Sequence, residues 1–150
     1  MGGLLPMELQ IFLGVFIFIA GTCVGSFLNV CIYRIPLEQS IAFPPSHCPH
    51  CSTPLKTKDL LPIISYLLLK GKCRYCDAGI SMRYPLVELL TGLVWLTIYI
   101  KFGLSIETAA FIYLFSVLIA VFFIDIDHMI IPNGLVLTGL AGGLLIFIYN

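Results

Sequence analysis

The chain has 150 residues, of which 59% are hydrophobic and only 11% are charged, and its mean hydropathy is +1.04. A soluble domain is usually about half apolar and a quarter charged, so this composition predicts an integral membrane protein that has phospholipid as a partner. The formal net charge is zero, which excludes a broad electrostatic attraction to nucleic acid.

An apolar run from about residue 11 to residue 35 is long enough to cross a bilayer at ~1.5 Å per residue. We assign residues 1–36 to the first transmembrane helix, ended by Arg34 and Pro36. Gly21 and Gly25 are spaced for close packing against another helix, and an amide in lipid needs a hydrogen-bond partner. Asn29 therefore either supports helix packing or lines a polar site.

Residues 37–84 form a polar loop that carries two Cys-x-x-Cys pairs with 21 residues between them. This spacing predicts a four-thiolate metal site with the ligands Cys48, Cys51, Cys73 and Cys76. Zinc in a structural role is expected, because four protein ligands leave no open position for a catalytic water. Two disulfides and a rubredoxin-like iron site remain alternatives. A loop this short lacks a large core, so metal binding would supply much of its folding free energy.

Other residues of the loop are expected to support the metal site. His47 and His50 flank the first cysteine pair and are expected to be bystanders. Residues 65–69 could form a short strand or a helical turn. Apolar residues between the two pairs are expected to pack on the metal-held turns, namely Leu60, Leu61, Ile63, Ile64, Tyr66 and Leu67.

The distribution of cations predicts the orientation of the chain. Seven of the eight Lys and Arg residues lie between Arg34 and Arg83, which places the loop in the cytoplasm and the amino terminus outside. A reducing cytoplasm also favours thiolates over disulfides.

Three further apolar runs follow, at about residues 85–100, 108–124 and 134–149. Together with the first run they predict an all-α membrane protein with about four transmembrane helices. Pro85 suits the first turn of its helix.

Asp125 ends the third apolar run, near a helix carboxyl end where the dipole disfavours an anion. Ionisable groups at the edge of lipid are costly and often functional, so Asp125 is either a general base or a mark of where the helix leaves the membrane. Asp127 is a poor partner for it, because residues two apart on a helix point in different directions. Glu88 is expected to pair with Arg83 or with a neighbouring helix.

Several motifs occur together and in order: Gly-Ser-Phe-Leu-Asn-Val at 25–30, Arg-Ile-Pro at 34–36, the two cysteine pairs, Gly-Lys-Cys at 71–73, Ile-Ser-Met-Arg-Tyr-Pro-Leu-Val-Glu at 80–88, and Asp125 with Ile-Pro-Asn at 131–133. In these motifs the chain resembles the bacterial type IV prepilin peptidases of aspartic peptidase family A24. The resemblance covers nearly the whole chain.

The resemblance implies an enzyme of the inner membrane that serves type IV pili or type II secretion. Such enzymes cut the basic leader from prepilins or pseudopilins at the cytoplasmic face, then methylate the new amino terminus with S-adenosylmethionine. On this pattern Asp125 is the first catalytic aspartate and the four cysteines are the metal ligands. Arg83 and Glu88 match a recurrent motif, and no Gly-rich loop identifies the S-adenosylmethionine site.

The chain departs from the family in one respect. The second catalytic aspartate of the family lies in a Gly-x-Gly-Asp motif, which these 150 residues do not contain. We therefore expect an amino-terminal part in which residues 85–150 form only the start of the peptidase domain, unable to cleave alone. The alternatives are a non-enzymatic zinc-loop module that binds pilin leaders or assembly proteins, and a methyltransferase-only half.

Overall fold

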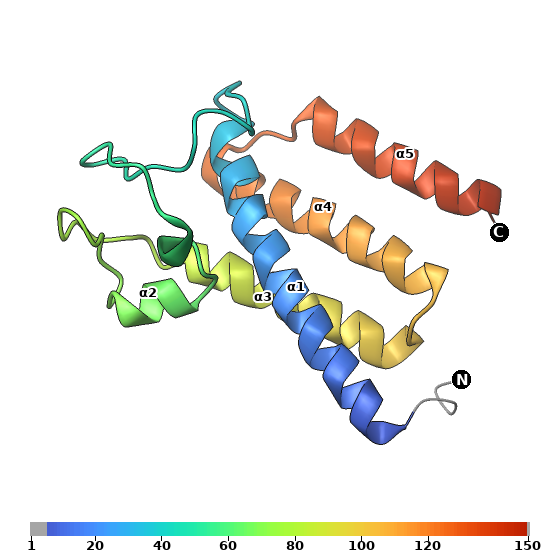
Figure 1. Cartoon of the computed structure of the whole chain (residues 1–150). Coiled ribbons are helices and arrows are strands. Elements are labelled where there is room, and N and C mark those ends of the chain that lie inside the picture. Colours follow the sequence, from blue (N-terminus) through green and yellow to red (C-terminus); the bar gives the residue numbers. More distant parts are fainter. Residues whose placement is uncertain (1–5, 150) are drawn as a thin grey trace.

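The computed structural model describes residues 6–149, with side chains through residue 144. Those residues form helices and contain no strand, only two isolated β-bridges, which confirms the all-α fold (Figure 1). The elements are α1 (Met7–Arg34), the 3-10 helix η1 (Thr57–Asp59), α2 (Ile64–Leu68), α3 (Arg83–Phe102), α4 (Ile106–His128) and α5 (Asn133–Tyr149).

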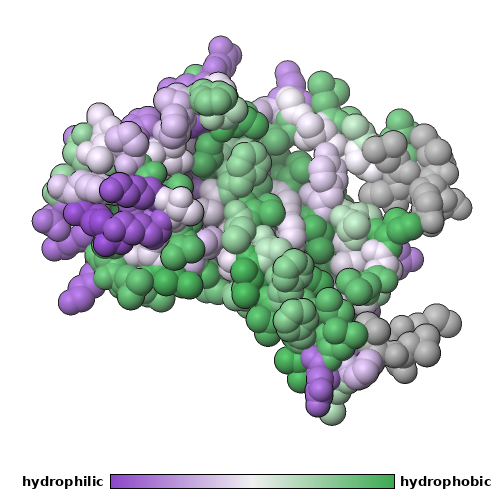
Figure 2. All heavy atoms as spheres, viewed as in Figure 1, coloured by the Kyte–Doolittle hydropathy of each residue, from purple (hydrophilic) through white to green (hydrophobic). Residues whose placement is uncertain are grey.

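Three of the helices, α1, α3 and α4, are long and apolar enough to cross a membrane. The fourth expected span corresponds to α5, a 17-residue helix that extends about 25 Å at ~1.5 Å per residue, somewhat short of a full crossing. Figure 2 shows apolar side chains over the helices and polar ones gathered on the loop between α1 and α3. On α1 the exposed apolar residues include Ile11, Phe12, Val15, Phe16 and Ile19, a surface suited to lipid.

Glycines set the distance between α1 and α3. A Cβ added at Gly21 would lie 2.9 Å from the Cα of Gly92, and one at Gly25 would lie 2.7 Å from the Cα of Glu88. Both distances are shorter than a real side chain tolerates, so only glycine permits this approach. The two contacts also show that the helices are antiparallel, because later residues of α1 meet earlier residues of α3.

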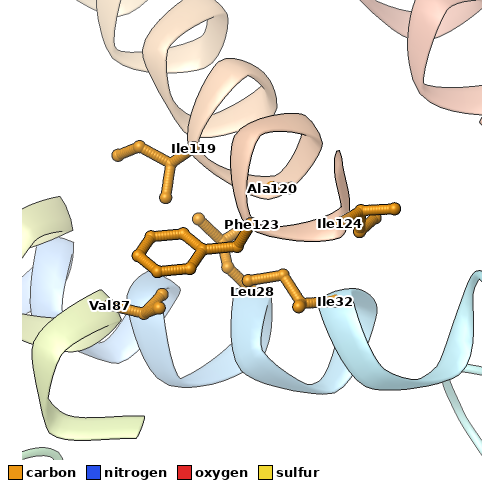
Figure 3. Close-up of a cluster of buried hydrophobic side chains, with 7 residues drawn as sticks. All are labelled: Leu28, Ile32, Val87, Ile119, Ala120, Phe123 and Ile124. Carbon is orange, nitrogen blue, oxygen red and sulfur yellow. The ribbon is translucent and has the colours of Figure 1, made fainter. Parts of the chain in front are cut away.

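Helix α4 packs against both α1 and α3. A buried apolar cluster forms where α1 ends, α3 begins and α4 ends, and Figure 3 shows its side chains converging from the three helices. Its members are Leu28, Ile32, Val87, Ile119, Ala120, Phe123 and Ile124. Helix α5 packs against α4, and the Tyr113 hydroxyl donates to the Thr138 carbonyl at 2.6 Å.

We predict that Gly21→Ala destabilises the protein by about 1–3 kcal/mol, because its methyl group would push α1 away from the α3 backbone. The matched control is Gly143→Ala on α5, where an added Cβ meets nothing within 4 Å. That change should be neutral or stabilising by up to about 1 kcal/mol through helix propensity. Thermal unfolding in detergent measures both variants, and equal shifts would refute the packing role of Gly21.

Candidate functional site

The first cysteine pair forms a tight turn closed by backbone hydrogen bonds. The Cys48 N–H donates to the Thr53 carbonyl at 3.0 Å, and the Ser52 N–H donates to the Cys48 carbonyl at 2.8 Å. Ser52 adopts a positive φ of 55°, the left-handed conformation that reverses the chain after Cys51. The turn thereby directs the two sulfurs to the same side.

The second pair repeats this turn bond for bond. The Cys73 N–H donates to the Ala78 carbonyl at 2.8 Å, the Asp77 N–H donates to the Cys73 carbonyl at 3.0 Å, and Asp77 has a positive φ of 57°. The isolated bridges follow the same repeat, since one joins the residues before and after each turn. The loop is thus built from two equivalent turns, a symmetry that the sequence analysis recognised only in the cysteine spacing.

The four sulfurs converge. The Sγ atoms of Cys48, Cys51, Cys73 and Cys76 all lie within 4.8 Å of one another, and those of Cys48 and Cys76 are 3.8 Å apart. A tetrahedral ion with metal–sulfur bonds of ~2.3 Å separates its sulfur ligands by about 3.8 Å, so four thiolates could hold a zinc ion here, or an iron ion in the same geometry. All four cysteines are free in this structure, whereas a disulfide has a sulfur–sulfur distance of about 2.05 Å.

The four thiols differ in acidity. The Thr53 side chain and N–H stabilise the Cys51 thiolate and lower its pKa to about 6. The Ala78 N–H also favours the Cys76 thiolate, but burial and the hydrogen bonds shared with the other three sulfurs outweigh it and raise the pKa of Cys76 to about 12. Without a metal, Cys76 therefore keeps its proton at neutral pH while Cys51 is largely ionised.

Asp59 ties η1 to the second turn. Its carboxylate accepts hydrogen bonds from Arg74 Nε at 2.6 Å and from the Tyr75 hydroxyl at 2.8 Å, and the Lys56 N–H donates to it at 3.1 Å. Burial opposes ionisation of Asp59, but these donors outweigh it and lower its pKa. The sequence analysis missed Asp59; the donor side chains between the two cysteines of the second pair were the available signal.

The apolar residues of the loop do not pack as expected. Leu60, Leu61, Ile64 and Leu67 are 41%, 46%, 55% and 67% exposed, so their predicted packing on the metal-held turns is wrong. Backbone bonds already close each turn, and the loop is too small to cover these side chains. Tyr66 is half-buried, with its hydroxyl over Gly71. Residues 65–69 form a helical turn, not a strand, since α2 covers most of them.

A cavity of about 1110 Å³ lies between the end of α1, the start of α3 and the loop. Asn29 lines it and donates from Nδ2 to the Tyr84 carbonyl at 3.0 Å, so this residue both joins two helices and faces a polar site. Glu88 also lines the cavity, and its Oε2 accepts the Ile63 N–H at 2.7 Å. Ser26 on α1 is its second hydrogen-bonding neighbour, so Glu88 has a helix partner as expected.

Glu88 does not pair with Arg83, the other alternative that the sequence analysis gave. Arg83 instead forms an ion pair with Asp127, which joins the first turn of α3 to the last turn of α4. Helix α4 continues through Asp125 and ends with Met129 in the left-handed conformation. Asp125 is exposed and has no side-chain partner among residues 6–144. Asp125 and Asp127 both lie on α4, where residues two apart are expected to point in different directions, and Asp127 is occupied by Arg83.

These contacts gather the candidate residues at one end of the bundle. The ion pair holds the end of α4 against the start of α3, and the Ile63–Glu88 hydrogen bond holds the loop against the same part of α3. In Figure 1 the loop lies beside the end of α1 and the start of α3. Asp125 and the four-cysteine loop therefore lie at the same end of the helices.

The fold and the site define a class, a helical membrane protein with a four-thiolate loop between its first two long apolar helices. Residues 19–102, more than half of the chain, match the family described as Bacterial Peptidase A24 N-terminal domain. The chain belongs to this family, and its relatives and apolar helices indicate a bacterial inner-membrane protein.

Curated relatives support the same assignment. The chain is 46% identical over 130 residues to the prepilin leader peptidase/N-methyltransferase of Myxococcus xanthus, covering 87% of this chain and 39% of that protein. It is 40% identical over 144 residues to the type 4 prepilin-like proteins leader peptide-processing enzyme of Escherichia coli, covering 81% and 54%. The chain spans about half the length of such relatives or less. No solved structure matches the chain.

We predict that the protein binds one zinc ion per chain, with an affinity that falls at least about tenfold for each pH unit below 8. Because the pKa of Cys76 is about 12 without metal, zinc must displace at least one proton at neutral pH. Competition with a chromophoric chelator at several pH values measures this slope. Cys76→Ser should abolish tight binding, whereas Cys23→Ser, outside the cluster, should preserve it. A pH-independent affinity would contradict the prediction.

Proposed function

We propose that this chain is the amino-terminal part of a prepilin leader peptidase/N-methyltransferase. The whole enzyme would cut the basic leader of type IV prepilins or pseudopilins at the cytoplasmic face of the inner membrane and methylate the new amino terminus. The observation that carries the proposal is that Asp125 and the four-cysteine loop lie at the same end of the bundle. Relatives up to 46% identical bear that name.

Asp125 is the proposed catalytic carboxylate. It is exposed at the end of α4, so a substrate chain leaving the bilayer can reach it, and no cation among residues 6–144 holds it in an ion pair. As a general base it would take a proton from the attacking water, while a second carboxyl protonates the leaving amine. Asp127 cannot be that second group while it pairs with Arg83. The resemblance assigns the role to a Gly-x-Gly-Asp motif outside these 150 residues.

The loop of residues 37–84 is proposed to hold a structural zinc ion through Cys48, Cys51, Cys73 and Cys76. Bound zinc would tie the two turns together and, with four protein ligands, would leave no position for a reacting water. The exposed leucines of the loop lie close in sequence to four of its lysines, a combination suited to anionic phospholipid headgroups. This supports a cytoplasmic loop, with the amino terminus outside.

The cavity is the proposed location of methyl transfer. When bound, S-adenosylmethionine would supply the methyl group. The cavity volume of about 1110 Å³ suffices for a ligand of that size together with a peptide end, and the lining offers both apolar and polar groups. Residues 1–36 and 37–84 supply most of this lining, and residues 85–150 begin the peptidase domain.

A methyltransferase-only half is the second candidate, favoured by one observation. The cavity is formed entirely by residues of this chain, whereas the second catalytic aspartate is not among them. A binding module that neither cuts nor methylates is the third outcome of the experiments below.

We predict that joining this chain to the portion of the Myxococcus xanthus relative beyond the matched region yields an enzyme that shortens prepilin on a gel. In this fusion Asp125→Asn should lower the cleavage rate by a factor of about 10² to 10⁴, because the general base is lost. The matched control is Glu107→Gln, an exposed carboxylate at the opposite end of α4, which should cleave normally. Full cleavage by the Asp125→Asn fusion would remove the peptidase role from this residue.

We also predict that the 150-residue chain alone transfers label from methyl-labelled S-adenosylmethionine to a pilin peptide whose leader is already removed. It should leave intact prepilin uncut, because one of the two carboxyls is missing. Mass spectrometry of the peptide amino terminus measures the transfer. Unlabelled peptide from the chain, with labelled peptide from the fusion, would refute the methyltransferase-only half.

A further inference from the structure

Two buried acceptor groups line the cavity on neighbouring turns of the α1–α3 contact, Asn29 on α1 and Glu88 on α3. Asn29 is 3% exposed and Glu88 is 7% exposed, and both border the cavity. They are held close because Gly25 lies against the Glu88 backbone one turn before Asn29 bonds to the Tyr84 carbonyl. The close approach of α1 and α3 at Gly25 thus determines where the Asn29 amide and the Glu88 carboxylate lie.

The Asn29 side chain has an acceptor that nothing in the described chain satisfies. Its Nδ2 donates to the Tyr84 carbonyl, which fixes the amide, because the reversed orientation would set two oxygens against each other. Oδ1 is then buried without a hydrogen-bond partner. A buried orphan acceptor is costly in free energy and is a position where a ligand donor would be favourable.

Glu88 has unused acceptor capacity, and no cationic side chain among the described residues forms an ion pair with it. A carboxylate offers about four acceptor positions, and the Ile63 N–H and Ser26 occupy two of those on Glu88. Neither partner is charged. The other carboxylate that lines the cavity, Asp59, already pairs with Arg74.

The cations that line the cavity are also engaged elsewhere. Arg34 donates to the carbonyls of Ser40 at 2.9 Å and Pro44 at 2.7 Å. Arg83 pairs with Asp127 through Nη1, while its Nε is buried without a hydrogen-bond partner among the described residues. Within the described chain, Glu88 is therefore a buried carboxylate whose counter-charge is not supplied by the protein. Burying such a charge favours a cationic ligand in the cavity.

We propose that this cavity binds a primary ammonium group, which donates to Asn29 Oδ1 and to the Glu88 carboxylate. An ammonium has three N–H donors and one positive charge, and so satisfies the orphan acceptor and the unpaired carboxylate together. Apolar side chains around them, such as Phe27, Val30 and Phe43, suit a hydrophobic remainder of the ligand. If the proposed function holds, the ammonium belongs either to the amino terminus of a processed pilin or to the amino-acid part of S-adenosylmethionine.

Binding to the zinc-loaded 150-residue chain in detergent, measured by calorimetry, tests the site. The first probe is a short peptide that begins with phenylalanine, compared with its N-acetylated twin. The second is S-adenosylhomocysteine, compared with 5′-methylthioadenosine, which lacks the amino-acid part; sulfur is uncharged in both, so a sulfonium charge cannot cause the difference. We expect one ammonium-bearing probe to bind at least about tenfold more tightly than its ammonium-free counterpart. The pair that shows the difference identifies the source.

Two variants assign the preference to these residues. Glu88→Gln keeps an acceptor for the Ile63 N–H but removes the charge, and Asn29→Leu removes the orphan acceptor. Either variant should reduce the preference about tenfold, whereas Glu107→Gln should preserve it. If a variant misfolds, the comparison of ammonium-bearing and ammonium-free probes on the wild-type chain still tests the site.

No preference for the ammonium in either pair, or a preference unchanged in both variants, would overturn the site. Ammonium binding without cleavage or methylation by the fusion would refute the proposed function and leave the site standing.

Discussion

The close approach of α1 and α3 through glycine is the constraint on which the other contacts depend. Gly21 and Gly25 bring the backbones of the two helices together. Because of this close approach, Asn29 donates a hydrogen bond to the Tyr84 carbonyl, and Ser26 lies within hydrogen-bonding reach of Glu88. In lipid, helix association gains little from the hydrophobic effect, so close backbone packing and interhelical hydrogen bonds take its place. The contact between α1 and α3 that stabilises the bundle therefore also positions residues that line the cavity.

The loop is stabilised differently from the helices, because it has almost no apolar core of its own. Of its cysteines, Cys48 and Cys73 are buried, while the leucines around α2 are exposed. Backbone bonds form the two turns, Asp59 fixes the second turn to η1, and convergence of the sulfurs leaves the final closure to a metal ion. The loop is thus held by hydrogen bonds and an ion pair rather than by apolar packing, and a metal ion bound by the four cysteines would complete its closure.

The sequence predicted the helices and the cysteine cluster because both depend on local patterns, namely runs of apolar residues and a fixed cysteine spacing. It could not predict that Arg83 pairs with Asp127, 44 positions away, in place of Glu88. Nor could it place Asp59 under Arg74 and Tyr75, since those contacts follow from how the loop closes. Asn29 shows the same limit: the packing role and the polar-site role were alternatives in sequence, and the structure has both.

Arg83 provides a physical link between the two proposed chemistries. It lines the cavity, and its ion pair holds Asp127, two positions from Asp125 on the same helix. Asp127 is thereby committed to an ion pair, while Asp125 stays unpaired among the described residues and available as a base. A single arginine thus borders the cavity and also holds the end of α4 against the start of α3.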